Sequence, residues 1–373
     1  MKPAGEKLRI AVMFGGRSGE HEVSLQSARS VLSVLDPALY SVLQIGITHD
    51  GAWLVGENVL QALEQSAINR LARATILPDP TLPGLYRFQS NETGLQLEFL
   101  SGVDVVFPVL HGTFGEDGTV QGLLEMAGVA YVGAGVLGSA LAMDKGVFHA
   151  VMRAEHIPVV ETLVLLRSEI QADMETALSR AEKVAPYPLY TKPANLGSSV
   201  GVCKCTSRAD LMEGMLESCR YDRRILVQRG VNAREIEVSV LGNEHPQASL
   251  PGEILPSREF YSYEAKYIDN TSGLLIPAPI PEATTELVRQ LAVQAYQAVD
   301  CAGIARVDFL LDRERGELFL NEINTIPGFT QISMYPKLWE ASGLPYPALV
   351  QKLIELALER KTERDRNEYR YQV

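Results

Sequence analysis

The sequence predicts an α/β fold that opens with an N-terminal parallel α/β domain, and its first part carries most of that prediction. Residues 8–14 form an apolar, strand-like run that leads into two glycines, and a helical pattern follows over 22–35. Two more apolar runs of the buried-strand type occupy 42–47 and 103–110. A strand, a glycine turn and a helix in this order are the typical start of a parallel α/β domain.

The rest of the chain alternates helical and strand-like segments. Residues 56–98 are rich in Pro, Gly and polar residues and predict no defined structure. Helices are expected over 118–127, 139–156, 208–219 and 282–300, and strands over 164–166, 188–192, 199–204, 224–228 and 236–241. The buried face of the last helix is predicted to carry Leu287, Leu291, Ala295 and Ala298. We expect three domains, formed by residues 1–138, 139–235 and 236–373.

Composition limits the class of protein. The chain has 373 residues, 46% of them hydrophobic, and a formal net charge of −12. This charge argues against a general nucleic-acid binder, because phosphate backbones require a basic surface. The sequence lacks the long apolar run of a membrane span and the apolar core of a signal peptide. Four cysteines without metal-ligand spacing predict reduced thiols in a cytoplasmic protein.

The strongest functional signal lies within residues 304–325, where a turn-like segment separates two strand-like runs that should pair as a hairpin. With a period of two, Arg306 and Asp308 share one face of the first strand. Glu322 and Asn324 share one face of the second. The side-chain oxygen atoms of Asp308, Glu322 and Asn324 suit Mg²⁺ that also carries substrate phosphates. A lone acidic hairpin is commonly solvated surface, but these acids lie within apolar runs, where an unpaired carboxylate is costly.

A loop of small residues follows Lys192 and joins two predicted strands. Gly197, Ser198, Ser199 and Gly201 let backbone N–H groups approach an anion closely, and the hydroxyl groups add donors. The loop lacks the order of a Walker A motif and does not lead into a helix. On its own it is typical of a hairpin turn, but the preceding lysine and the acidic hairpin favour a phosphate-binding loop.

Two N-terminal segments have the chemistry to bind an amino acid. Glu20 and Glu22 lie at a helix N-terminus, where a carboxylate attracts an ammonium group and helix N–H groups attract a carboxylate. The alternative is a capped helix whose acids complement its dipole. His111 and Glu116 follow a predicted strand at the sheet edge where open α/β sheets bind ligands. A structural hydrogen-bonding role is the alternative for both.

Two C-terminal loops add candidates. Lys266 and Tyr267 lie in a long polar loop, which is typical either of a lid or of an exposed aromatic surface. Gly328 follows a proline and permits backbone donors to face a developing oxyanion.

Together these motifs resemble the ATP-grasp superfamily and, within it, the longer, A-type D-alanine–D-alanine ligases, from about Arg9 to the helix near 355. The resemblance implies three α/β domains, with ATP between the second and third. It implies that two Mg²⁺ ions, replaceable by Mn²⁺, are held by Asp308, Glu322 and Asn324. It implies that ATP is bound by Lys145, Lys192, Gly197, Ser198, Ser199, Gln228, Val231, Glu235 and Lys266. Gln228 departs from the family pattern, which often has Glu there.

For the first D-alanine, the resemblance places Glu20 near the ammonium group and His111 near the carboxylate end. Ser198 and Tyr267 would form a hydrogen-bonded set with Glu20 that closes the lid. Relatives that make a D-alanyl–D-lactate ester usually lack the lid tyrosine, so Tyr267 favours amide formation.

For the second D-alanine, the resemblance implies that Ser333 and Lys266 hold its carboxylate and that Met334 packs near its side chain. A leucine can occupy the Met334 position in the family. Arg306 and the Gly328 N–H would stabilise the tetrahedral intermediate.

The function implied is ATP-dependent ligation of two D-alanine molecules through an acyl phosphate, for peptidoglycan precursor synthesis. A cytoplasmic homodimer without nucleic-acid or membrane partners is expected. Two alternatives stay open. Another ATP-grasp ligase would differ only around Glu20, Tyr267 and Ser333. A non-catalytic nucleotide-binding module would need neither Arg306 facing the metal hairpin nor a second substrate pocket.

Overall fold

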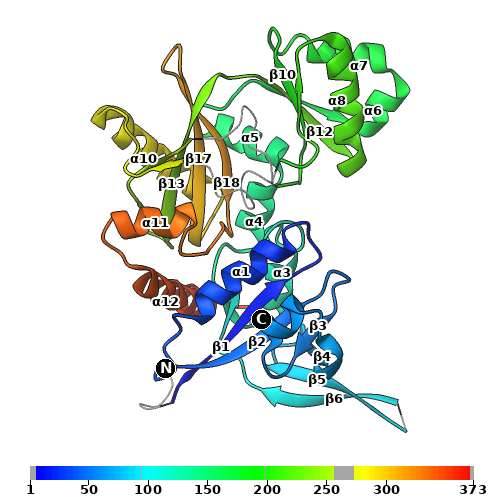
Figure 1. The fold of residues 1–373 in the computed structure, drawn as a ribbon, viewed down its shortest axis with the longest axis vertical. Coiled ribbons are helices and arrows are strands. Elements are labelled where there is room, and N and C mark those ends of the chain that lie inside the picture. The colour runs from blue at the N-terminus through cyan, green and yellow to red at the C-terminus, as the bar shows by residue number, and fades with distance from the viewer. Residues whose placement is uncertain (1–5, 93, 198, 256–272, 370–373) are drawn as a thin grey trace.

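The structure is a computed structural model that describes residues 6–92, 94–197, 199–255 and 273–369. Among these residues the strands form three sheets, of eight, four and six strands. The eight-stranded sheet lies lowest in Figure 1, the six-stranded sheet lies above it, and the four-stranded sheet lies at the upper right. Within the described part of the chain, no helix is long and apolar enough to cross a membrane. Ser198, Lys266 and Tyr267 lie outside the described residues.

The eight-stranded sheet has the predicted parallel centre. Strand β1 (Leu8–Gly15) pairs in parallel with β2 (Tyr40–Ile47) and β7 (Val105–Pro108), and β7 pairs in parallel with β8 (Ala130–Tyr131). Helices α1 (His21–Leu32) and α12 (Tyr346–Arg364) cover one face of β1, and α3 (Thr119–Met126) covers the other. The last six residues of β1 are therefore buried, as in a parallel strand covered on both sides.

An antiparallel extension continues this sheet, so the prediction of no defined structure over 56–98 was wrong. The extension consists of β3 (Trp53–Val55), α2 (Val59–Glu64), a 3₁₀ turn (Ile68–Arg70), β4 (Ala72–Ile76), β5 (Leu85–Asn91) and β6 (Gly94–Ser101). No residue of β6 is fully buried. A strand without a buried face lacks the alternation of apolar and polar residues that reveals a strand in a sequence.

Two helices, α4 (Val136–Met143) and α5 (Lys145–Ala154), replace the single helix predicted over 139–156. The Asp144 carboxylate accepts hydrogen bonds from the N–H groups of Gly146 and Val147 and so starts a new helix. Helix α4 also spans the position where we placed the first domain boundary.

The four-stranded sheet is antiparallel, with the order β11-β10-β12-β9. Its strands are β9 (Thr162–Leu166), β10 (Leu189–Pro193), β11 (Cys203–Cys205) and β12 (Arg224–Arg229). Its helices are α6 (Arg167–Ala172), α7 (Met174–Ala181) and α8 (Arg208–Tyr221). These helices share one apolar core with the sheet. Because side chains alternate along a strand, Lys192 and Gln228 lie on the opposite face from that core.

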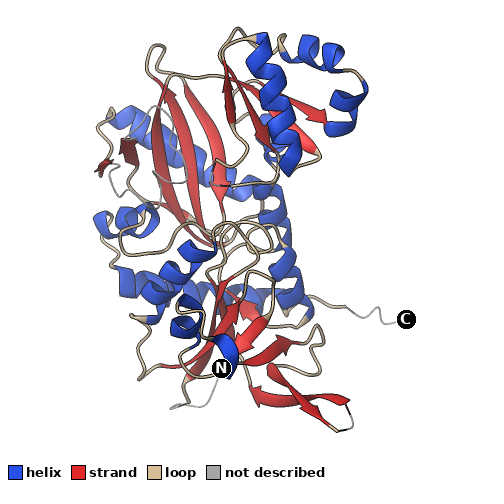
Figure 2. Ribbon diagram, turned by 45° about the vertical axis from the view of Figure 1, so that its right-hand side comes forward, coloured by secondary structure: helices blue, strands red, loops and turns tan. Residues whose placement is uncertain are grey.

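The six-stranded sheet is built around the long pair β13 (Ala233–Gly242) and β17 (Gly303–Asp312). The other strands are β14 (Gln247–Ala248), β15 (Gly252–Leu255), β16 (Gly273–Leu275) and β18 (Leu318–Asn324). Two helices accompany it, α10 (Glu282–Ala298) and α11 (Met334–Ala341). In Figure 2, loops drawn in tan meet between this sheet and the lowest one.

The predicted buried face of α10 was partly wrong. Ala295 is buried as expected, but Leu287 is 46% exposed, and Val288, Ala292 and Tyr296 are buried instead. Apolar side chains form two adjacent stripes on this helix, and both contribute to the core against the sheet. The stripe that carries Tyr296 is buried, whereas Leu291 and Ala298 are only partly buried.

Candidate active site

The acidic hairpin forms as the sequence predicted. Strands β17 and β18 pair so that Arg306 lies opposite Asn324 and Asp308 lies opposite Glu322. The Arg306 guanidinium donates two hydrogen bonds of 2.7 Å to the Asp308 carboxylate. The Asn324 amide nitrogen donates to the same carboxylate at 2.9 Å. Arg306, Asp308 and Asn324 therefore form one hydrogen-bonded cluster, and Glu322 lies on the neighbouring strand opposite Asp308.

Glu237 on β13 belongs to this cluster and was missed in the sequence. Its carboxylate lies 2.9 Å from the Arg306 guanidinium, and its side chain is 7% exposed. The segment over β13 alternates acidic or polar residues with apolar ones. That alternation could have predicted a polar face, but only the pairing of β13 with β17 shows that Arg306 lies on it.

Two lysines lie beside the hairpin. Lys145 Nζ is 3.4 Å from Glu322 Oε2 and donates a hydrogen bond of 3.0 Å to the Leu196 carbonyl. Burial, together with the nearby charge of Lys145, lowers the pKa of Lys192 to about 8. Placing two ammonium groups near one carboxylate leaves a local excess of positive charge. Such a site fits a polyanion, because an added negative charge would stabilise the charged form of Lys192.

His149 on α5 is a second residue that sequence reasoning missed. Its side chain is 1% exposed. Burial and the charges of Lys192, Arg153 and Lys145 lower its pKa to about 3. The imidazole is therefore neutral near pH 7 and adds no further charge to the lysine pair. Helical spacing from Lys145 could have placed it on the same face of α5.

Hydrogen bonds hold the start of the small-residue loop after Lys192 in place. Asn195 donates hydrogen bonds from its backbone and its side chain to Asp222, both of 2.9 Å, and from its side chain to Asp144 at 3.2 Å. Asp144 also forms an ion pair with Arg224. Ser199 has a φ of +60°, in the left-handed region that is uncommon for a residue other than glycine. The described part of the loop is thus anchored through Asp144, at the N-cap of α5, and Asp222, in the turn before β12.

The loop reaches the N-terminus of α1. A Cβ atom built on Gly197 would lie 3.4 Å from Glu20 Oε2, and one built on Gly112 would lie 2.9 Å from the same atom. Glu20 therefore lies between a loop of the four-stranded sheet and a loop of the eight-stranded sheet. It occupies the N-cap position of α1, but its side chain makes no capping hydrogen bond.

His111 joins the N-terminal sheet to the loop that follows β18. Its Nδ1 lies 2.9 Å from the Ile326 carbonyl oxygen, and its Nε2 lies 2.9 Å from Ser27 Oγ. Burial acts to lower the pKa of His111, but Glu116, 3.8 Å away, outweighs burial and raises it. Burial raises the pKa of Glu116 to about 7. Both ring nitrogens are engaged by the protein, so the predicted substrate contact of His111 stays a prediction.

Gly328 and Ser333 lie close together in the same loop. A Cβ atom on Gly328 would be 3.3 Å from Ser333 Oγ. The Ser333 hydroxyl oxygen accepts a hydrogen bond of 3.1 Å from the Thr330 N–H. Met334, the next residue, is 6% exposed and packs with Ile254 and Leu338. Gly328, predicted for the tetrahedral intermediate, and Ser333 and Met334, predicted for the second D-alanine, thus share one short segment beside the hairpin.

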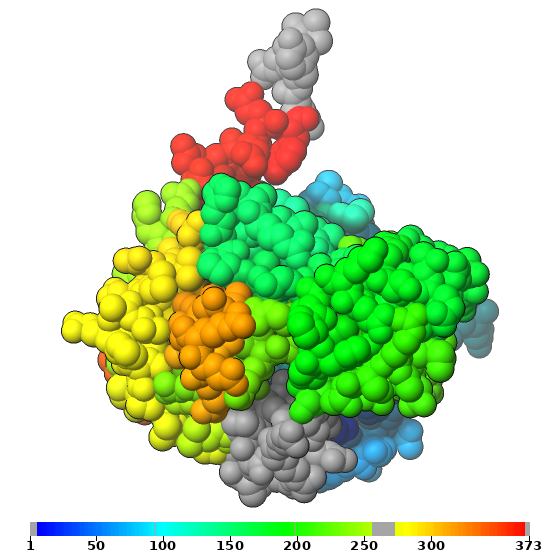
Figure 3. Space-filling model, turned by 90° about the horizontal axis from the view of Figure 1, so that it is seen from above, coloured from blue at the N-terminus to red at the C-terminus, as the bar shows by residue number. Residues whose placement is uncertain are grey.

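The predicted adenine and ribose residues lie where two sheets connect. Gln228 on β12 is buried and donates a hydrogen bond of 3.2 Å to Thr162 Oγ1. Val231 lies in the connection from β12 to β13, and Glu235 lies on β13 opposite Leu310. Figure 3 shows the green lobe that includes residues 162–229 beside the orange tip of the β17–β18 hairpin.

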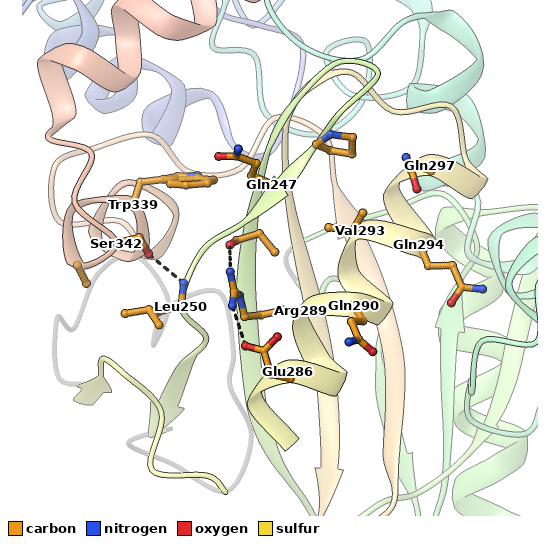
Figure 4. A pocket seen from close by; sticks show the side chains of 13 residues that line it. Gln247, Leu250, Glu286, Arg289, Gln290, Val293, Gln294, Gln297, Trp339 and Ser342 are labelled. Carbon is orange, nitrogen blue, oxygen red and sulfur yellow. Dashed lines mark hydrogen bonds and ion pairs between the residues drawn. The ribbon is translucent and has the colours of Figure 1, made fainter. Parts of the chain in front are cut away.

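A further cavity lies away from the residues described above. It has a volume of about 910 Å³ and is lined by residues of α10, β14 and α11 and of the segments around them, among them Arg289, Gln294 and Trp339. Arg289 forms an ion pair with Glu286, and Ser342 accepts a hydrogen bond from the Leu250 N–H, which Figure 4 shows. None of its lining residues is a predicted site residue.

The hairpin oxygens fit a divalent metal ion. Asp308, Glu322 and the side-chain carbonyl of Asn324 provide hard oxygen donors on two adjacent strands, as Mg²⁺ prefers. Arg306 and Asn324 donate hydrogen bonds to Asp308 and so hold its carboxylate in place.

Comparison with known proteins agrees with this geometry. The family model described as D-ala D-ala ligase N-terminus matches residues 9–134, and the D-ala D-ala ligase C-terminus model matches residues 151–355. The chain is 50% identical to the D-alanine–D-alanine ligase of Heliobacterium modesticaldum, over 97% of both chains.

Two solved structures are also similar. The D-alanine-D-alanine ligase from Coxiella burnetii is 38% identical, with a TM-score of 0.81 over 96% of each chain. The VanG D-Ala:D-Ser ligase from Enterococcus faecalis is 33% identical, with a TM-score of 0.83 over 94% of this chain and 100% of that one. The fold is therefore that of the ATP-grasp ligases. This chain belongs to the D-alanine–D-alanine ligase family.

Proposed function

We propose that this protein is an ATP-dependent ligase that joins two D-alanine molecules into D-alanyl-D-alanine through an acyl phosphate, for peptidoglycan precursor synthesis. The observation that carries the proposal is the placement of Lys145 and Lys192 beside the Arg306–Asp308 cluster. The two lysine ammonium groups can bind phosphate, and they lie next to side-chain oxygens that can bind Mg²⁺. The family membership supports the choice of substrates.

The first half-reaction activates a carboxylate. An oxygen of the first D-alanine carboxylate attacks the γ-phosphorus of ATP, an O–P bond forms, and the bond to ADP breaks. Lys145 and Lys192 offset the charge that moves between the phosphate oxygens. Glu20 would bind the ammonium group of this D-alanine, and the neighbouring Gly197 and Gly112 allow the carboxylate of Glu20 to approach closely.

The second half-reaction forms the amide. The deprotonated amine of the second D-alanine attacks the acyl carbon, and negative charge develops on the former carbonyl oxygen. Arg306 and the Gly328 N–H would stabilise that oxygen before the C–O bond breaks and phosphate leaves. Ser333 would hold the carboxylate of the second D-alanine, with Met334 nearby. Excluding water protects the acyl phosphate from hydrolysis.

We propose that Asp308, Glu322 and Asn324 hold two Mg²⁺ ions and that Mn²⁺ can replace them. Bound divalent metal supplies charge neutralisation at the phosphates. We further propose that Gln228, Val231 and Glu235 bind the adenosine part of ATP.

We propose three domains, formed by residues 1–138, 139–235 and 236–373, and the three sheets support that number. Helix α4 and strand β13 cross the two proposed boundaries. We propose that the protein acts in the cytoplasm as a homodimer and needs no nucleic-acid or membrane partner.

The test is ADP release by the purified protein with Mg·ATP and D-alanine, with the product identified by its mass. L-alanine, D-alanine with D-serine, and D-alanine with D-lactate are the comparison substrates. D-alanine-dependent ADP release with dipeptide formation supports the proposal. Activity only with D-serine or D-lactate as the second substrate would replace it by another ligase specificity, and ATP binding without any turnover would contradict a catalytic role.

A further inference from the structure

We propose that His21, Glu22 and His49 form a binding site for a divalent transition-metal ion such as Zn²⁺. The ligand atoms of these three residues all lie within 4.8 Å of one another. His49 Nε2 is 3.7 Å from Glu22 Oε1, and the two imidazole centroids are 3.8 Å apart. The site is separate from the oxygen donors of the β17–β18 hairpin, and the proposal does not depend on the ligase reaction.

His21 is already oriented as a ligand. It is 4% exposed in the first turn of α1, and its Nδ1 lies 2.9 Å from the Gly16 carbonyl oxygen. A carbonyl oxygen can only accept, so Nδ1 carries the proton and Nε2 keeps its lone pair. Metal-binding histidines are commonly held by a hydrogen bond of this kind from the other ring nitrogen. The buried ring therefore presents one defined donor atom.

Glu22 and His49 can complete the coordination by rotating. Their side chains are 69% and 66% exposed, so both have room to rotate. The His21 and His49 rings are stacked with an interplanar angle of 23°. The lone pairs of stacked rings point in nearly parallel planes, so the His49 ring must rotate to aim its nitrogen at an ion shared with His21, over a distance within 4.8 Å. A histidine stack that binds no metal is the alternative.

The donor set selects the metal. Two imidazole nitrogens and one carboxylate are typical ligands of Zn²⁺ and of its first-row neighbours, with water in the open position. Mg²⁺ prefers oxygen donors and gives up its water reluctantly. The two metals should therefore bind at separate places, Mg²⁺ at the hairpin and the transition metal beside α1.

The test is a Co²⁺ titration of the full-length protein in excess Mg²⁺, with the thiols alkylated so that cysteines cannot bind. We expect visible d–d absorption that saturates at one Co²⁺ per chain and disappears when Zn²⁺ is added. His49→Ala and Glu22→Gln should each weaken binding about tenfold or more. His245→Ala, which removes an exposed histidine outside the cluster, is the matched control.

Both tested side chains are exposed, so circular dichroism should show an unchanged fold. The proposal is overturned if the wild-type protein adds no d–d absorption to that of aqueous Co²⁺ under these conditions. It is equally overturned if His49→Ala binds Co²⁺ as tightly as the wild type, or if His245→Ala weakens binding as much as His49→Ala does.

Discussion

The two ends of the candidate site are built differently. At the nucleotide end, Arg306, Asp308 and Glu322 lie on paired strands, and Glu237 on a third strand braces Arg306. At the amino-acid end, Glu20 and the loops around it come from separate sheets. Strand pairing fixes side chains relative to one another, whereas loops are held by individual hydrogen bonds.

This difference implies a division of labour. Groups that must meet charge in the transition state belong on a rigid framework, because a preorganised dipole or cation needs no reorganisation during the reaction. Groups that admit and release substrate can lie on loops that move. We therefore expect substitutions at the hairpin to lower turnover and substitutions around Glu20 to weaken substrate binding.

Replacing Arg306 should have the largest effect. Arg306→Ala removes the cation that would meet the tetrahedral oxygen, and such a loss lowers turnover by about a hundred- to a thousandfold. Steady-state ADP release measures it. Arg315→Ala, in the exposed turn of the same hairpin, is the control and should leave the rate unchanged. An Arg306→Ala enzyme with full turnover would remove Arg306 from the chemistry.

Glu237 should act through Arg306. Glu237→Gln keeps the shape of the side chain but removes the charge that holds the guanidinium, so turnover should fall about 10- to 100-fold while ATP affinity stays constant. Glu253→Gln breaks a similar buried pair, with Arg234, outside the site. If both variants lose stability alike but neither loses turnover, Glu237 is only structural.

A substitution of Gly112 tests the amino-acid end of the site. Its φ is +77°, and a Cβ atom there would lie 2.6 Å from Ser18 Oγ and 2.9 Å from Glu20 Oε2. Gly112→Ala should therefore displace Glu20 and, at about 1–2 kcal/mol, raise the KM for D-alanine about 5- to 30-fold with little change in the KM for ATP. Gly122→Ala, which meets nothing within 4 Å, is the matched control. An unchanged KM for D-alanine would argue against Glu20 as its ligand.

The smallest effect that we expect is a pH dependence of ATP binding, caused by the titration of Lys192. In the free protein the pKa of Lys192 is lowered to about 8, and bound phosphates should raise it. Binding is then strongest below pH 8, where the lysine is charged in both states, and weakens by up to about tenfold per pH unit above it. Calorimetric titrations across this range measure the slope. Adenosine lacks phosphates, so its affinity should stay flat, and a flat profile for ATP as well would contradict a phosphate contact.

The hairpin was predictable because its information is local. A period of two in a short segment places Arg306 with Asp308 and Glu322 with Asn324, and a turn between the strands sets their register. Nothing in that segment identifies Glu237, which reaches Arg306 only through pairing with β13, a strand far away in sequence. Local alternation predicts a face of a strand, and tertiary pairing decides what lies on that face.

Elsewhere the local pattern was weaker. In α10 two adjacent apolar stripes both meet the core, and only packing against the sheet decides that Tyr296 is buried and Leu287 exposed. In β6 no residue is fully buried, so the pattern that marks a strand is lost. The contacts of His111 with Ser27 and Ile326 likewise join segments distant in sequence, and residue type alone does not reveal them.

The central claim is that the hairpin and its lysines serve carboxylate activation by phosphoryl transfer, and an oxygen-tracing experiment tests it most directly. The protein would be supplied with Mg·ATP and D-alanine labelled with ¹⁸O in the carboxylate, and the released phosphate analysed by mass spectrometry. An acyl phosphate requires one labelled oxygen to leave with each phosphate as the peptide bond forms. Phosphate without label, released while the dipeptide forms, would contradict this account.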